Sequence, residues 1–318
     1  MKYTFLLPAF KGRFLDEMLQ SIQRQTYTDF KVIISDDCSP EDLRSICEPY
    51  LKDPRFTYRR NAENMGSKSL VSHWNFLVDM CDTEFLIMAS DDDVYEPQFL
   101  EEIDKLTVKY PEVDLFRARV RLIDGEGNLL EKDILVEEFL TQLDFLYYFF
   151  HKGLQKCVAH YVFRNTTLKT KGGFFDLPLA WGSDDATAVM LSENGECNTP
   201  SICFSFRSSG INISMQGGIK ILREKTRSRY IFICFLDEYL LNLKNKLKSK
   251  YEATRYNKII CSLRGFYVNS LYIGAEFSTY KDMMTYYRYL SQKGLITGRL
   301  DKLHFFWTWL RAYKVRKV

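Results

Sequence analysis

The sequence has few of the residues that build zinc centres or disulfide frameworks. Its 318 residues include four histidines, and its eight cysteines are scattered without a C-x-x-C pair. Structural zinc sites and disulfide-bonded domains usually place such residues in close pairs, so neither is expected to organise this fold. The scattered cysteines instead indicate reduced thiols in a cytoplasmic protein.

Long apolar runs are missing as well. Those at residues 147–150 and 230–236 fall far short of the roughly 20 residues that a membrane-spanning helix needs. Near the N-terminus, Pro8 interrupts an apolar run that is too short for a secretion signal. We therefore expect a protein that is soluble or lies against a membrane surface.

The chain also carries little excess charge. Its net charge of +3 is too small to indicate nucleic acid as a general partner. Its length allows one large α/β domain with additions, or two domains.

Predicted strands and helices alternate along the N-terminal part of the chain. Apolar runs predict strands, and apolar residues at helical spacing predict the helices between them. The predicted strands cover residues 2–8, 31–35, 56–59, 84–89 and 113–123. This order is typical of a Rossmann-like, doubly wound, mostly parallel sheet. A turn at residues 124–127 is expected within a hairpin that extends the sheet, and the chain from residue 219 onward is expected to be helical.

Three adjacent carboxylates, Asp91, Asp92 and Asp93, follow the predicted strand at residues 84–89. Ligands of open α/β sheets bind at the carboxyl ends of the strands. A hard divalent cation shared with substrate phosphates would compensate the repulsion among these charges. The spacing alone equally allows a solvated acidic turn before a helix. A second acidic pair, Asp36-Asp37, also ends a strand, and two such clusters at one sheet edge favour a binding site.

Five motifs in this order resemble those of family 2 glycosyltransferases with the GT-A fold. They are residues 5–10 (FLLPAF), 21–30 (SIQRQTYTDF), 34–39 (ISDDCS), 64–66 (NMG) and 90–93 (SDDD). The resemblance implies an inverting, metal-dependent transferase. Residues 1–215 would form the GT-A nucleotide-sugar-binding and catalytic domain. Residues 216–318 would form a helical region for acceptor, membrane-surface or dimer contacts.

The resemblance implies that the nucleotide base lies at the first two strand ends. Asp37 would accept the N–H of a uracil base, while Pro8, Ala9 and Phe10 would line the base pocket, with Phe10 in place of the usual Tyr. For Asp36 and Asp37, the alternative is a turn or helix cap.

Asn64 and Gly66 would lie near the ribose and diphosphate of the donor. Lys68 is a candidate phosphate contact because of its charge, and the alternative is a solvated loop lysine.

The acidic stretch occupies the D-x-D position of the family. This position implies that Asp91 and Asp92 hold Mn²⁺ or Mg²⁺ against the diphosphate, where the metal neutralises the charge of the leaving group. Ser90 stands where many members have Asp, so the first acid is offset. Asp93 is a third candidate metal ligand, with a sugar-hydroxyl acceptor or a cap as alternatives.

An acidic pair before a helix, Asp184-Asp185, matches the position of the family's catalytic base. The resemblance implies that Asp185 deprotonates the acceptor hydroxyl during in-line attack. The alternative is that these residues cap the helix, a role we favour for Asp184.

One departure from the family concerns a later segment, where many members carry His. This chain has Arg207-Ser208-Ser209 there. Arg207, with Asn212 and Ser214, is a candidate diphosphate contact, and an ion pair closing the last strand is the alternative for Arg207.

The C-terminal residues 303–310 predict an aromatic helix, followed by basic Arg311, Lys314, Arg316 and Lys317. Such a helix could contact the surface of an anionic membrane, where a polyprenyl-linked acceptor would lie. The alternatives are that it packs on its own core or that it forms a homodimer.

Two other functions fit the architecture of the N-terminal part. A sugar-phosphate nucleotidyltransferase would need a Gly-rich basic loop after the first strand, where only Lys11-Gly12-Arg13 occurs. The second function is that of a catalytically silent nucleotide-binding subunit. The only feature that favours it is the absence of the His that many family members carry in the segment of Arg207-Ser208-Ser209.

Overall fold

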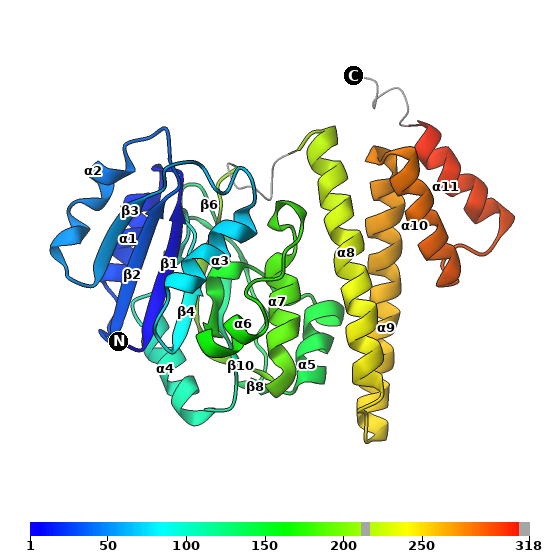
Figure 1. Ribbon diagram of the computed structural model, residues 1–318. Coiled ribbons are helices and arrows are strands. Elements are labelled where there is room, and N and C mark those ends of the chain that lie inside the picture. Colours follow the sequence, from blue (N-terminus) through cyan, green and yellow to red (C-terminus); the bar gives the residue numbers. More distant parts are fainter. Residues whose placement is uncertain (211–216, 312–318) are drawn as a thin grey trace. The chain divides into compact units, whose positions relative to one another are not determined.

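The computed structural model describes residues 1–210 and 217–311, which belong to two compact units (Figure 1). The first unit comprises Met1–Phe145, Gly153–Asp176 and Ser183–Asn212. The second comprises Leu146–Lys152, Leu177–Gly182 and Ile213–Val318. Two short stretches of the expected N-terminal domain therefore group with the helical unit.

A mixed sheet forms the frame of the first unit. Among the described residues it has ten strands, in the order β3-β2-β1-β4-β9-β6-β10-β5, with β7 on β6 and β8 on β10. The strands are β1 (Tyr3–Ala9), β2 (Phe30–Asp36), β3 (Phe56–Arg60), β4 (Phe85–Met88), β5 (Val94–Tyr95), β6 (Leu115–Asp124), β7 (Leu129–Lys132), β8 (Phe139–Leu140), β9 (Tyr161–Arg164) and β10 (Glu196–Ser208).

The predicted α/β fold with a mostly parallel central sheet is confirmed. Strands β1, β2, β3 and β4 pair in parallel, as do β6 and β10. Strand β7 pairs antiparallel with β6, as the predicted hairpin requires. The alternation did not predict that antiparallel β9 lies between β4 and β6.

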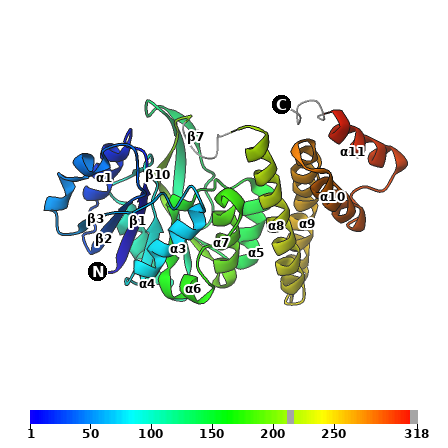
Figure 2. The same ribbon diagram turned by 45° about the horizontal axis from the view of Figure 1, so that its top comes forward.

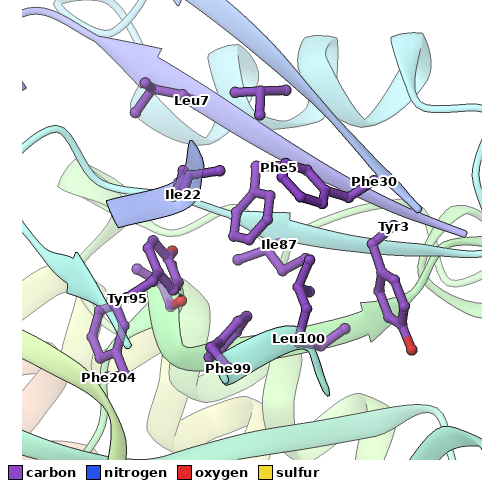
Figure 3. Packing of buried hydrophobic residues seen from close by; sticks show 14 of the residues in the cluster. Tyr3, Phe5, Leu7, Ile22, Phe30, Ile87, Tyr95, Phe99, Leu100 and Phe204 are labelled. Carbon is purple, nitrogen blue, oxygen red and sulfur yellow. Dashed lines mark hydrogen bonds between the residues drawn. The ribbon is translucent and has the colours of Figure 1, made fainter. Parts of the chain in front are cut away.

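Helices cover both faces of this sheet. Alternate residues of β1 point to opposite faces, so Tyr3, Phe5 and Leu7 join a buried cluster with residues of α1, α2 and α4, as Figure 3 shows in part. Helix α3 packs on β1 outside this cluster. The helices of this unit are α1 (Leu15–Gln23), α2 (Leu43–Cys47), α3 (Leu70–Met80), α4 (Phe99–Lys109), α6 (Asn165–Thr170) and α7 (Ser183–Leu191), and α5 (Gln142–Tyr147) is shared with the second unit.

Tyr95 fixes the end of the acidic turn in the core. Its ring is buried and lies 5.1 Å from that of Phe5 and 5.0 Å from that of Phe204 (Figure 3). Its hydroxyl donates to the carbonyl of Ala159 at 2.9 Å, and its backbone N–H donates to Ser21 Oγ. Because the backbone of Ala89 bonds to β1 before the turn, residues 90–94 are held at both ends.

The second unit is helical, as the sequence predicted. Helices α8 and α9 lie side by side in both views (Figure 1 and Figure 2). A reciprocal cap between Ser249 and Glu252 begins α9, and Thr279 caps α10. Across residues 1–210 and 217–311, no helix is both long and apolar enough to cross a membrane. The helices are α8 (Ile219–Lys244), α9 (Lys250–Val268), α10 (Tyr280–Gln292) and α11 (Arg299–Arg311).

Candidate active site

The carboxyl ends of β1, β2 and β4 meet at Phe10. Its backbone N–H donates to Asp91 Oδ2 at 2.9 Å, and its carbonyl accepts from Ser39 Oγ at 2.6 Å. The carbonyl of Ala9 accepts from the N–H of Asp37 at 2.9 Å. The two acidic clusters therefore lie at one sheet edge with residues 8–10 between them. Phe10 is 36% exposed, so it is accessible to a ligand.

Asp36 serves as a structural residue of this edge. Its Oδ1 accepts from the N–H of Ser39 at 2.8 Å, and its Oδ2 accepts from Tyr58 Oη and Arg60 Nη1 at 2.5 Å each. The carboxylate is fully buried and faces protein donors. This is the turn-forming role that was the alternative for the pair.

Asp37 holds the following loop. Its Oδ1 accepts from Asn61 Nδ2 and the N–H of Met65, both at 2.8 Å, and its Oδ2 accepts from the N–H of Gly66 at 2.7 Å. His73 Nδ1 lies 3.5 Å from the same Oδ2. A carboxylate offers about four lone-pair sites, of which these three hydrogen bonds use three. A Cβ at Gly66 would lie 2.9 Å from Asp37 Oδ2, which explains the glycine of the N-x-G motif.

Two other residues of this loop, Asn64 and Lys68, were predicted to lie near the nucleotide-sugar donor, and both contact protein groups. Asn64 Oδ1 accepts from the N–H of Ser67 at 2.7 Å and so shapes the turn before α3. Lys68 Nζ lies 2.7 Å from Glu63 Oε1, and both side chains are 66% exposed. Lys68 therefore has the geometry of the solvated loop lysine that was its alternative.

The three carboxylates of the acidic turn have different surroundings. Asp91 Oδ2 accepts from the N–H groups of Phe10 and Lys11. Asp93 is fully buried, and its Oδ1 accepts from the N–H of Arg207 at 2.9 Å. Asp92 is 6% exposed. Asp91 and Asp93 thus brace the turn through backbone N–H groups of other segments.

Burial makes the charges of this turn unfavourable. It raises the pKa of Asp92 to about 6, aided by the charge of Asp91 and opposed by Lys11 and Arg207. Burial also raises the pKa of Asp91 and, together with the charge of Asp92, that of Asp93 well above its usual range. A cation at this turn would stabilise the ionised carboxylates.

Arg207 closes β10 against the acidic turn. Its Nε donates to the carbonyl of Asp92 at 2.9 Å, and its Nη2 donates to Glu17 Oε2 at 2.7 Å. The guanidinium also lies over the ring of Phe14, 4.5 Å from its centroid, and the residue is 2% exposed. These contacts match the ion-pair alternative for Arg207 rather than a diphosphate contact. Asn212 and Ser214 lie outside the described residues.

The candidate base lies in the first turn of α7. Asp185 is 8% exposed, and its N–H donates to Asp184 Oδ1 at 3.0 Å. Burial raises the pKa of the Cys157 thiol well above its usual range, and the charges of Asp93, Asp184 and Asp92 add to this effect. Asp184 of α7 and the acidic turn after β4 therefore both act electrostatically on the same buried thiol.

Comparison with known sequences agrees with this arrangement. Residues 4–162, half of the chain, match the family described as glycosyl transferase family 2. The chain belongs to glycosyl transferase family 2.

Curated relatives of this family 2 member match part of its length. Chondroitin synthase of Escherichia coli is 33% identical over 135 residues, which cover 40% of this chain and 18% of that protein. The poly(ribitol-phosphate) β-N-acetylglucosaminyltransferase TarS of Staphylococcus aureus (strain Mu50) is 22% identical over 130 residues, which cover 40% of this chain and 22% of TarS. The chain thus spans about a fifth of the length of these relatives.

Solved structures share its fold. Residues 1–349 of S. aureus TarS, in complex with UDP-GlcNAc, superpose with a TM-score of 0.60 at 15% identity, covering 100% of this chain and 91% of that one. The mannosyltransferase PcManGT of Pyrobaculum calidifontis, in complex with GDP-Man and Mn²⁺, gives 0.52 at 13% identity, covering 99% and 86%. These likenesses establish the GT-A fold.

The structure of this family 2 member also reveals a clamp that links α3 to α7. Asn75 Oδ1 accepts from the N–H of Phe174 at 2.7 Å, and its Nδ2 donates to the carbonyl of Phe174 at 3.3 Å. Gly173 has φ +87°, and a Cβ there would lie 2.5 Å from Asn75 Oδ1. The next N–H, of Phe175, donates to Thr187 Oγ1 of α7 at 2.9 Å. In the sequence, Asn75 precedes the acidic stretch and Gly172-Gly173 forms a glycine pair. Neither feature predicts that Asn75 binds the backbone of Phe174.

We expect Asn75→Ala to lower the catalytic rate without removing nucleotide binding. The substitution deletes both bonds to Phe174, which should destabilise the fold by about 1–3 kcal/mol and loosen the loop that holds α7. Steady-state kinetics and UDP titration would measure the two effects. Ser72→Ala, at an exposed position one turn earlier on α3, is the matched control. Equal rates for both variants would show that the clamp does not position α7.

Proposed function

We propose that the chain is an inverting glycosyltransferase that uses a UDP-sugar and glycosylates a hydroxyl group in bacterial polysaccharide synthesis. The observation that carries this proposal is the meeting of the acidic turn with the ends of β1 and β2, where the N–H of Phe10 donates to Asp91 Oδ2 and its carbonyl accepts from Ser39 Oγ. This edge would hold the nucleotide and its diphosphate, and the candidate base Asp185 lies in the first turn of α7 in the same unit.

The choice of UDP rests on Asp37 and its neighbours. Three protein donors occupy the carboxylate, and the remaining lone-pair site suits the imide N–H of uracil. Phe10, exposed at the same sheet edge, offers a surface for the base. The TarS structures with UDP-GlcNAc and UDP support the same choice by analogy of fold.

The acidic turn fits a divalent cation. Carboxylate oxygens are preferred ligands of Mg²⁺ and Mn²⁺, and such ions are commonly held by one or two carboxylates together with substrate phosphates. Within the described parts of the chain, no group of three or more His, Cys, Asp or Glu side chains is arranged to hold a metal ion, so an ion at the acidic turn would also need ligands from the substrate phosphates. Asp92, with Asp91, would therefore hold the ion, and Asp93 stays a weaker candidate because it is buried against Arg207. When bound, the ion would neutralise charge on the leaving diphosphate.

Asp185 would act as the general base. In an inverting transfer, its carboxylate takes the proton of the acceptor hydroxyl while the oxygen attacks the anomeric carbon opposite the diphosphate. The first turn of a helix favours a carboxylate through the helix dipole. The clamp through Asn75 and Thr187 would keep this turn in place.

The acceptor is proposed to be a glycan or a polyprenyl-linked glycan. A relative from Campylobacter jejuni, 28% identical over 152 residues, is named a GalNAc(5)-diNAcBac-PP-undecaprenol β-1,3-glucosyltransferase. Such an acceptor would place the enzyme in the cytoplasm, at the inner face of the membrane.

Two alternatives have less support. A sugar-phosphate nucleotidyltransferase would need basic groups after β1, and there the N–H of Gly12 donates to Glu41 instead of lying in a Gly-rich loop. A silent nucleotide-binding subunit would not need Asp185 at the position of the family's catalytic base.

The proposed function is tested by a donor-hydrolysis screen across UDP-, GDP- and dTDP-sugars with Mn²⁺. We expect release of UDP to exceed that of the other nucleotides, because Asp37 accepts from an imide. Preferential release of GDP would refute the assignment of the base, and no release with any donor, even with candidate acceptors added, would favour the silent subunit.

A further inference from the structure

The small net charge of the chain hides a division between its two parts. Residues 217–311 contain 18 Lys and Arg residues against 7 Asp and Glu residues, whereas residues 1–210 contain 23 against 34. The helical part therefore carries a net charge of +11, and the sheet-bearing part −11. A charge of this size in about a hundred residues attracts an anionic partner.

Helix α11 presents a stripe of large apolar side chains to solvent. Leu300, Leu303, Trp307 and Leu310 are 80%, 67%, 54% and 57% exposed. Their spacing of three and four residues places all four on one face of the helix. Phe305, on the other side, is fully buried. The helix is thus fixed to its own unit by one face and exposes a second apolar face.

Cations border this stripe on both sides. Helical spacing places Arg299 one turn before Leu303 and Arg311 one turn after Trp307, on opposite edges of the stripe. The Arg311 guanidinium lies 5.2 Å from the centroid of the Trp307 ring and pairs with Glu276. Long arginine stems can lie along apolar surface while their charged ends stay in a polar layer.

We propose that the apolar stripe of α11 inserts into the surface of an anionic lipid bilayer. Interfacial helices combine Leu and Trp on one face with flanking Lys and Arg, and the flanking charges bind anionic headgroups. A second copy of the chain is a less favourable partner for this stripe, because its residues 217–311 also carry a net charge of +11 and the two segments would repel each other. The inference does not depend on the donor or on the catalytic base.

Vesicle sedimentation of the full chain tests this surface. We expect binding to phosphatidylcholine vesicles that contain phosphatidylglycerol, little binding to phosphatidylcholine alone, and weakening as salt increases. Trp307→Glu should weaken binding by roughly tenfold, since it places a charge in the inserted face. Leu241→Glu adds the same charge at an exposed leucine on α8, outside the stripe, and should bind like the unsubstituted chain.

A second measurement keeps the fold intact. Lipids brominated in their acyl chains should quench tryptophan fluorescence of the unsubstituted chain, and Trp307→Phe should bind vesicles normally but lose part of that quenching. Absence of vesicle binding, or equal binding of Trp307→Glu and Leu241→Glu, would overturn the proposal. So would a dimer in solution that Trp307→Glu converts to a monomer, because a second copy would then cover the stripe.

Discussion

Asp185→Asn is expected to reduce sugar transfer by about 100- to 10,000-fold while UDP binding stays near that of the unsubstituted enzyme. The amide has nearly the volume of the carboxylate but cannot accept a proton from the acceptor hydroxyl. The residues proposed to bind the nucleotide and the metal, Asp37 and Asp91, follow β2 and β4 and keep their own partners. Transfer assays with saturating donor, together with UDP titration, would separate the two effects.

Asp184→Asn is the matched control for this prediction. Asp184 is adjacent, half-buried and accepts from the N–H of Asp185, so its substitution perturbs the same helix turn without removing the proposed base. We expect a loss of less than about tenfold, the scale of one hydrogen bond. Full activity of Asp185→Asn, or an equal loss for both variants, would remove Asp185 from its assigned role.

The strands that carry this site could be predicted because the sequence patterns that indicate a strand are local. Apolar runs predicted β1, β2 and β4, and parallel strands bring their carboxyl ends to one edge. The acidic residues after β2 and β4 were therefore expected to meet, and the bonds of Phe10 to Asp91 and Ser39 show that these strand ends do meet. Motif order, which reflects the same local segments, predicted the family.

The different roles of the adjacent acidic residues in each cluster could not be predicted from the sequence. Adjacent residues of one type differ only in the tertiary partners they find, so Asp36 faces Tyr58 and Arg60 while Asp37 faces the loop at residues 61–66. Arg207 likewise depends on Glu17, which lies far away in the sequence. The position of β9 between β4 and β6 involves long-range pairing that periodicity does not encode.

Asp92→Asn is expected to abolish the stabilisation of the protein by Mn²⁺ and UDP and to lower transfer by at least about 100-fold. Burial and the charge of Asp91 raise the pKa of Asp92 to about 6, so its ionised form is unfavourable in the metal-free fold. A neutral amide removes this repulsion. The metal-free variant should therefore unfold at the same or a higher temperature than the unsubstituted enzyme.

Thermal unfolding with and without Mn²⁺ and UDP would show the two opposite effects. Ligand that binds only the folded state raises the unfolding temperature according to its concentration and affinity, and this rise should vanish in Asp92→Asn. Glu126→Gln, which removes an exposed carboxylate from the hairpin turn, should keep the full rise. If Asp92→Asn also kept it, the ion would not depend on Asp92; if the metal-free variant were strongly destabilised, Asp92 would instead be a structural residue of the turn. An unchanged or raised metal-free stability combined with a lost ligand response is the outcome that only a metal-binding role for Asp92 explains.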